Sequence, residues 1–248
     1  MKLLIINPNI SHSVTNLIES EARRTAAPQT EITMETAPTG VAYIETQAEA
    51  LFGAYAAIHI LAERHSHFDA AIIAAFGDPG LMEAQEIFPI PVVGLSQAAF
   101  MTACLVGQRF SIVAISKRIV PWYRRAVELN GLTARLASVR NLPEPLSDVG
   151  SIQEMYGETL LDLCLSAARD DGADAIVIAG APLAGLARRI QQHVPVPLLD
   201  GVTCAVAQAE LLASRNLRAP AAIREADRPR KAQKGLDPAV AKLMVAQP

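Results

Sequence analysis

The chain has 248 residues, of which 51% are hydrophobic and 19% are charged, and its formal net charge at pH 7 is −3. This composition is too apolar for a disordered protein and supports one large domain or two smaller lobes. The small negative charge argues against nucleic acid as the main ligand.

The first predicted strand covers residues 3–6 and runs into Asn7-Pro8-Asn9. This opening is too short for a signal peptide, and no apolar run in the chain reaches about 18 residues, so neither a leader nor a membrane span is expected. A cytoplasmic protein is the resulting prediction. Helical periodicity follows over Ser13–Ala26, with Ser11 or Ser13 as the cap, and a long alanine-rich helix is predicted over Tyr43–Arg64.

An internal repeat organises the rest of the chain. The segment Asp69–Ala75 resembles Asp174–Gly180 at an offset of 105 residues, and Gly80-Leu81 falls on Gly185-Leu186 at the same offset. Both segments are continuous apolar runs, which is typical of parallel strands covered on both faces. We therefore expect an α/β fold of two similar Rossmann-like lobes. Each lobe would be a parallel sheet of about four strands flanked by helices, with a site in the crevice between the lobes.

The repeat also sets the expected domain boundaries. Residues 1–100 are assigned to the first lobe and 101–200 to the second, with a helix at about 201–214 returning to the first lobe. Residues 215–248 form a basic, Pro/Ala-rich tail. We interpret the tail as a solvated extension, and a basic patch for an anionic partner is the alternative.

Polar residues at the ends of predicted strands are the candidates for ligand binding. Asn7 and Asn9 precede a helix, where amide groups suit a carboxylate or a polarised carbonyl, although a proline turn capped by Ser11 is an equal alternative. In the loop Phe76–Gly80, Asp78 is a candidate base or, alternatively, a helix cap. The equivalent loop, Gly180–Gly185, has no ionisable group and offers only backbone N–H donors.

Four segments carry a resemblance to the aspartate/glutamate/hydantoin racemase family, and within it to the hydantoin and allantoin racemases. They are Ile6–Asn9, Phe76–Leu81, Val92–Leu95 and Ala184–Ala187, and the likeness covers roughly residues 1–212. In that family one cysteine from each lobe faces the substrate, and the two thiols exchange protons on opposite faces of the carbon. The resemblance puts these cysteines at Ala75 and Gly180, so two-thiol racemisation is excluded for this sequence.

The three cysteines present do not replace the missing pair. Cys104 and Cys164 fall within predicted helices and are interpreted as buried structural thiols. Cys204 follows a strand end and is the one with a possible route to the site.

Other acid–base groups must therefore serve if the chain is an enzyme. Asp78, Tyr43 and Glu45 are the predicted catalytic residues; Tyr43 and Glu45 precede a helix where related racemases have a loop facing the site. The alternatives are packing for Tyr43 and a helix-dipole charge for Glu45. Further candidates are Ser116, Lys117 and His12. The predicted substrate-binding residues are Asn7, Asn9, Phe76, Gly77, Ser96, Ser116, Gly180, Ala181 and Pro182.

The expected function is cofactor-independent acid–base chemistry on a small amino-acid derivative, cyclic ureide or dicarboxylate, of racemase, isomerase or lyase type. A small-molecule binding protein without turnover is the alternative, and a purely structural role ranks third. No phosphate loop, dinucleotide fingerprint or metal-ligand motif is present, so no metal or cofactor is expected. The resemblance further implies a homo-oligomer, and from the charge and the lack of a long apolar run we expect neither a nucleic-acid partner nor a membrane partner.

Overall fold

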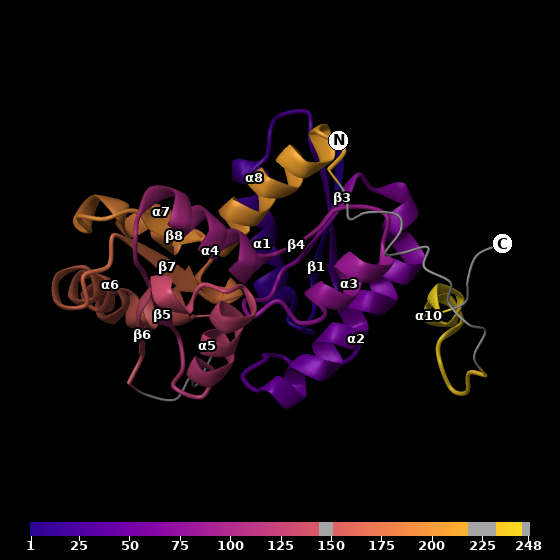
Figure 1. Cartoon of the computed structure of the whole chain (residues 1–248), viewed down its shortest axis with the longest axis horizontal. Coiled ribbons are helices and arrows are strands. Elements are labelled where there is room, and N and C mark those ends of the chain that lie inside the picture. The colour runs from indigo at the N-terminus through magenta and orange to yellow at the C-terminus, as the bar shows by residue number, and fades with distance from the viewer. Residues whose placement is uncertain (144–150, 218–231, 245–248) are drawn as a thin grey trace.

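Two parallel sheets with the same strand order form the core of the computed structural model, which describes residues 1–143, 151–217 and 232–244. The first sheet has the order β2-β1-β3-β4 and the second β6-β5-β7-β8. In Figure 1 the two sheets lie side by side, each flanked by helices. The predicted fold of two similar α/β lobes is confirmed. The strands are β1 Lys2–Asn7, β2 Glu31–Thr36, β3 Ala70–Ile73, β4 Val92–Gly94, β5 Phe110–Ala114, β6 Leu136–Asn141, β7 Ala175–Ala179 and β8 Leu198–Asp200.

Helices connect the strands in both lobes. They are α1 His12–Thr25, α2 Gln47–Arg64, α3 Leu81–Ile87, α4 Leu95–Val106, α5 Val120–Leu129, α6 Ile152–Asp170, α7 Leu186–Ile190, α8 Gly201–Ser214 and α10 Pro238–Leu243. None of the helices within the described residues is long and apolar enough to cross a membrane.

Helix α1 shows how a local pattern becomes tertiary structure. The Ser11 hydroxyl accepts a hydrogen bond from the Val14 N–H and caps the helix. Of the two caps predicted, Ser11 and Ser13, the structure therefore has Ser11. Val14, Ile18 and Ala22 are buried and form a stripe of one residue per turn. The stripe holds the start of the helix, and with it the loop after β1, against the first sheet.

Helix α2 begins later than predicted. Thr46 caps it in a reciprocal capping box: its hydroxyl accepts from the Glu49 N–H, and the Glu49 carboxylate accepts from the Thr46 N–H. The helix therefore starts at Gln47 rather than at Tyr43. This correction leaves Tyr43 and Glu45 in the loop before the helix.

The outer strands β2 and β6 were not located from the sequence. Their residues are only partly buried for the most part, so they lack the continuous apolar run of the central strands. Parallel pairing with β1 and β5 defines them instead. Because such edge strands are not fully covered by other elements, they lack a continuous apolar run and are hard to recognise in the sequence.

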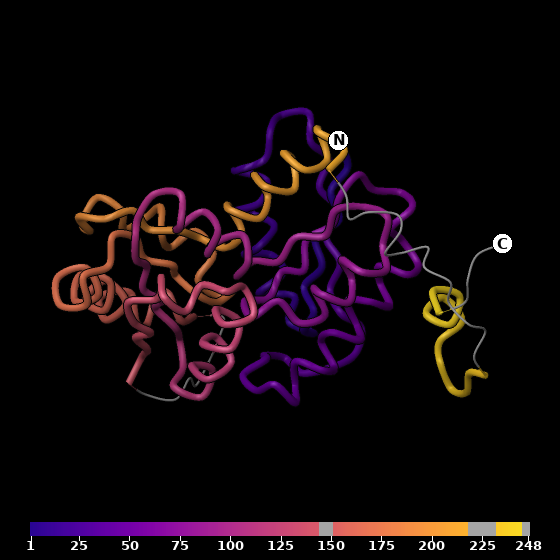
Figure 2. The backbone as a smooth tube through the Cα atoms, viewed as in Figure 1, coloured from indigo at the N-terminus to yellow at the C-terminus, as the bar shows by residue number. Residues whose placement is uncertain are grey.

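The last helix of each lobe packs across the lobe boundary. Helix α4 follows β4 of the first sheet but lies against β5, β7 and β8 of the second, while α8 follows β8 and lies against β3 and β4. In Figure 2 the orange turns of α8 lie beside the indigo segments of the first lobe. The two helices also pack on each other, and the Gln208 side chain donates to the Ala98 carbonyl oxygen at 2.9 Å. The lobes are thus joined through a shared core.

The described end of the tail differs from the predicted solvated extension. Helix α10 packs on α2, its Val240 side chain is 3% exposed, and Asp237 lies 3.3 Å from the His59 imidazole. The basic segment of the tail lies largely in residues 218–231, outside the described residues.

Candidate functional site

The loops that follow β3 and β7 are equivalent and meet between the lobes. Ile73 pairs with Ile6 in the first sheet, and Ile178 pairs with Val113 in the second. Ala75 and Gly180 each lie two residues beyond these pairs, at the carboxyl edge of the sheet, where parallel α/β sheets bind ligands. The strand register therefore supports the equivalence of the two positions that the sequence repeat predicted.

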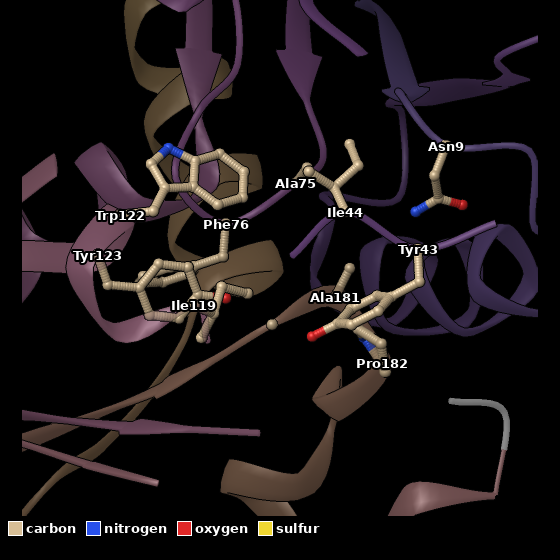
Figure 3. A pocket seen from close by; sticks show the side chains of 11 residues that line it. Asn9, Tyr43, Ile44, Ala75, Phe76, Ile119, Trp122, Tyr123, Ala181 and Pro182 are labelled. Carbon is tan, nitrogen blue, oxygen red and sulfur yellow. The ribbon is translucent and has the colours of Figure 1, made fainter. Parts of the chain in front are cut away.

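A small pocket of about 20 Å³ lies between these loops. Its volume corresponds to about one water molecule, so the pocket is narrow. Figure 3 shows its side chains converging from both lobes. The lining residues are Asn9, Tyr43, Ile44, Ala75, Phe76, Ile119, Trp122, Tyr123, Gly180, Ala181 and Pro182.

Tyr43 supplies the pocket with a buried hydroxyl that has no hydrogen-bond partner among the described residues. Its oxygen points toward the middle of the cluster in Figure 3. Burial raises the pKa of Tyr43 far above its ordinary value, and the nearby Glu45 carboxylate raises it further. The hydroxyl therefore stays protonated at neutral pH and is suited to donate a hydrogen bond to a ligand oxygen.

Asn9 supplies a second polar group. Its Oδ1 accepts from the Asn7 side chain at 3.0 Å and from the Ser11 N–H at 2.9 Å, which fixes the orientation of the amide. The Nδ2 group donates to no acceptor among the described residues, and Figure 3 shows it on the side of the Asn9 side chain that faces Tyr43. Asn7 itself is fully buried and does not line the pocket; it acts by holding Asn9.

Backbone donors come from both loops. The N–H groups of Ala75, Phe76, Gly180 and Ala181 donate to no acceptor among the described residues. Paired unsatisfied N–H groups at strand ends are suited to a carbonyl or carboxylate oxygen. Gly180 has φ +122°, a backbone conformation that L side chains rarely adopt. A side chain at this position would be strained even though the space beside Ile115 could hold a Cβ.

Asp78 lies outside the pocket, on the far side of its loop. Its Oδ1 accepts from the Ser96 N–H at 2.9 Å and its Oδ2 from the Gln97 N–H at 2.7 Å. The carboxylate thus satisfies the first amides of α4, with Asp78 itself at φ 52°. Burial raises its pKa to about 6, although the hydrogen bonds from Ser96 and the backbone oppose the shift.

Asp78 instead faces a larger groove of about 390 Å³ between α2, the loop before α3, the start of α4 and α5. Gly77 borders this groove as well, and the pocket residue Trp122 lines both cavities. We refer to this cavity as the groove. The structure therefore separates two predicted catalytic residues, with Tyr43 at the pocket and Asp78 at the groove.

The remaining predicted residues lie near the pocket without lining it. Glu45 is directed toward Arg118 at 3.8 Å. The Ser96 hydroxyl accepts from the Gly77 N–H at 3.2 Å and so holds the loop. The Ser116 hydroxyl accepts from the Arg118 N–H at 3.2 Å. Of the nine predicted binding residues, the structure brings Asn9, Phe76, Gly180, Ala181 and Pro182 to the pocket.

Sequence reasoning missed the apolar wall of the pocket. Ile44 comes from the loop before α2, and Ile119, Trp122 and Tyr123 come from the start of α5. The one available signal was the aromatic pair after Pro121, which follows the strand equivalent to β1. Such a pair is equally compatible with packing or an interface, so the pattern did not identify it.

The cysteines do not reach the pocket. Cys164 is buried in α6, where burial raises its pKa to about 12. Cys204 is buried in α8, and burial likewise raises its pKa. Cys104 is half-buried in α4. Within the described residues, no cluster of His, Cys, Asp or Glu side chains is arranged to hold a metal ion.

Comparisons with known proteins agree with this architecture. A sequence model of the Asp/Glu/hydantoin racemase family matches residues 3–209. A hydantoin racemase from Paenarthrobacter aurescens is 35% identical over 219 residues, which cover 86% of this chain and 91% of the relative. The structure of an allantoin racemase from Klebsiella pneumoniae is similar with a TM-score of 0.90 and 30% identity, covering 97% of this chain and 98% of that one. An allantoin racemase from Pseudomonas fluorescens gives a TM-score of 0.84 and 33% identity, covering 94% and 100%.

Proposed function

The chain belongs to the Asp/Glu/hydantoin racemase family, and from this membership we propose that it acts on a small amino-acid derivative or cyclic ureide by acid–base chemistry. The reaction would be of racemase or isomerase type, or of lyase type, and would use no cofactor and no pair of thiols. By the resemblance drawn from the sequence, Ala75 and Gly180 stand at the positions of the family's two cysteines. The proton-transfer groups must therefore come from elsewhere in the chain.

The observation that carries the proposal is the convergence of two equivalent loops on one pocket. The residues of these loops that line the pocket have four N–H groups without an acceptor among the described residues, and the Tyr43 hydroxyl and the Asn9 amide add two side-chain donors to the lining. Such donors stabilise negative charge that develops on a carbonyl oxygen when the adjacent carbon loses a proton. The lining contains no cationic side chain. A neutral cyclic ureide or amide therefore suits the pocket better than a dicarboxylate does.

Tyr43 and Asp78 would divide the acid–base work. Tyr43, held protonated, would donate to the enolate-like oxygen. Asp78, with a pKa of about 6, has the value expected of a general base near neutral pH, and it lines the groove, which shares Trp122 with the pocket. Glu45 is the third proposed group, because it precedes the α2 cap close to Tyr43.

Binding without turnover is the second proposal, and one observation favours it. The only ionisable side chains that line the pocket are Tyr43 and Tyr123, and burial raises the pKa of both. Neither can remove a proton at neutral pH. A chain that has lost both thiols and gained no base would retain the pocket as a binding site.

Exchange of the α-proton in D₂O, followed by NMR, distinguishes the two proposals. The panel comprises 5-substituted hydantoins, allantoin, aspartate, glutamate and small dicarboxylates. If the chain is an enzyme, we expect exchange or product with a ureide, slowed by about 10²-fold or more in Tyr43→Phe or Asp78→Asn. Glu45→Gln tests the third group, and Glu31→Gln, at an exposed position, is the matched control.

Saturable binding of a panel member without exchange would establish the binding protein instead. The absence of both binding and exchange across the panel would contradict both proposals.

We also propose that the chain forms a homo-oligomer, as the family resemblance implies. Leu51, Phe52 and Tyr55 project from α2 and are exposed in the single chain. Apolar groups gathered in this way mark association surfaces. Light scattering coupled to size exclusion measures the oligomeric state, and a monomer at all concentrations would contradict the proposal.

A further inference from the structure

A single side chain lines both the small pocket and the groove. Trp122 lines the pocket of about 20 Å³ on one side and the groove of about 390 Å³ on the other. The pocket by itself is too small for any ureide, whereas the groove falls within the range of about 300–1,000 Å³ that small-molecule sites occupy. Access and volume therefore depend on where this indole ring lies.

Packing alone holds the Trp122 ring in place. The ring lies directly on Gly77, where a Cβ would come within 2.4 Å of indole Cε2. Its other ring neighbour, Tyr123, is tilted at 6.0 Å between centroids. The indole N–H donates to no acceptor among the described residues, and it is not one of the buried polar atoms that lack a partner. A change of rotamer would therefore break no hydrogen bond within this part of the chain.

The position of Trp122 in its helix favours such movement. It lies in the first turn of α5, immediately after Pro121. Its side chain is 8% exposed, so the ring is close to solvent at the groove while its other face meets the pocket. Rotation of the ring toward the groove opening would join the two cavities.

The lining of the groove indicates what it can bind. Leu51, Leu81, Ala126 and Leu129 contribute apolar surface. At one side Gln85 Nε2 donates to Gln97 Oε1 at 3.1 Å, so these amide groups are engaged with each other. The charged residues of the lining are the carboxylates Asp78 and Glu83, with no cationic side chain among them. Such a cavity suits an uncharged apolar group and disfavours an anion.

We propose that the groove is the subsite for an apolar substituent on the substrate, and that Trp122 is the residue that determines how large this substituent can be. The inference rests on the proposed function, because it places the reacting part of the substrate in the pocket between Ala75 and Gly180. Any ureide requires the Trp122 ring to move, because the pocket is too small to hold one as it stands. A methyl-sized substituent then stays within the enlarged pocket, whereas a benzyl-sized substituent extends into the groove and requires the ring to move further.

The test compares 5-methylhydantoin and 5-benzylhydantoin by calorimetry in the full chain. Trp122 is the only tryptophan of the chain, so its fluorescence reports the ring directly. We expect 5-benzylhydantoin to change the emission and the acrylamide quenching of wild type. In Trp122→Ala the affinity ratio of benzyl to methyl compound should rise by roughly tenfold or more. Trp122→Phe, which keeps an aromatic ring against Gly77, should give a smaller rise.

A matched pair of surface variants tests the groove itself without disturbing the core. Leu51 lines the groove and is 72% exposed, whereas the adjacent Phe52 is 66% exposed and does not line it. Leu51→Glu should lower the benzyl-to-methyl affinity ratio, and Phe52→Glu should leave it unchanged.

Two results would overturn the inference, and only the second would also contradict the proposed function. An affinity ratio that is the same in wild type, Trp122→Ala and Leu51→Glu, with both compounds bound, would remove the subsite and retain the proposed function. Failure of wild type to bind either compound would remove the subsite together with the cyclic-ureide assignment.

Discussion

Asp78 illustrates how one partly buried carboxylate can serve structure and chemistry together. It accepts two backbone N–H groups at the start of α4, yet burial dominates and raises its pKa to about 6. In the unfolded chain its pKa is near 3.8. Between these two values the folded protein binds more protons than the unfolded chain, so the contribution of Asp78 to stability falls as pH rises.

The raised pKa of Asp78 predicts how the stability of the protein changes with pH. The shift from 3.8 to about 6 corresponds to roughly 3 kcal/mol of extra cost for the ionised form. The free energy of unfolding of wild type minus that of Asp78→Asn should therefore decrease by about that amount from pH 4 to pH 7. Urea unfolding at a series of pH values measures it. A difference that is constant over this range would show that burial does not raise the pKa of Asp78.

The capping box of α2 is the element that positions the Tyr43 loop. Thr46 and Glu49 satisfy each other's backbone N–H groups, and the Glu49 carboxylate also accepts from the Glu45 N–H at 2.8 Å. The cap therefore ties the residues after Tyr43 to the first turn of the helix. Its loss should loosen the loop that holds the buried hydroxyl.

At the scale of the element we predict a loss of about 1 kcal/mol in the free energy of unfolding for Thr46→Ala. The loss arises because the Glu49 N–H is left without its partner. Thr46→Ser, which keeps the hydroxyl, is the matched control and should remain close to wild type. Equal stability of the alanine and serine variants in urea unfolding would mean that the cap contributes nothing.

Helices α4 and α8 each pack on the opposite lobe, and this packing couples the two lobes of the molecule. Phe100 in α4 is fully buried, with its ring edge-on to Phe76 of the first lobe at 5.5 Å and stacked on Phe110 of the second at 5.3 Å. A salt bridge from Arg188 in α7 to the buried Glu21 in α1, at 3.2 Å, adds a second connection. The core is continuous across the crevice.

We therefore predict that both lobes unfold in one cooperative transition. Phe100→Ala should lower the free energy of unfolding by about 3–5 kcal/mol, and Phe100→Leu by less, because a cavity forms where the two lobes meet. Far-UV circular dichroism reports all helices, while the fluorescence of Trp122 reports the crevice. The two midpoints should coincide in wild type and shift together in each variant. Separate midpoints would mean that the lobes fold independently.

Much of the architecture could be predicted from the sequence, because continuous apolar strands are visible wherever a parallel sheet is covered on both faces. The segments around Ile73 and Ile178 had this character and repeated at a fixed offset, so the lobes and the equivalence of Ala75 and Gly180 followed. The partly buried strands β2 and β6 could not be predicted in this way, since their pairing depends on neighbours distant in sequence.

The composition of the site was decided by tertiary structure. Which loop residues face the pocket depends on local backbone angles and on how the lobes pack. At Asp78 a φ of 52° directs the carboxylate to α4 and the groove, while Tyr43, before the cap of α2, directs its hydroxyl inward. Trp122 meets Gly77 only because the start of α5 packs against the loop after β3. The sequence by itself determined the two lobes and their paired loops; long-range packing determined which side chains meet there, because contacts between lobes leave no periodic pattern in the chain.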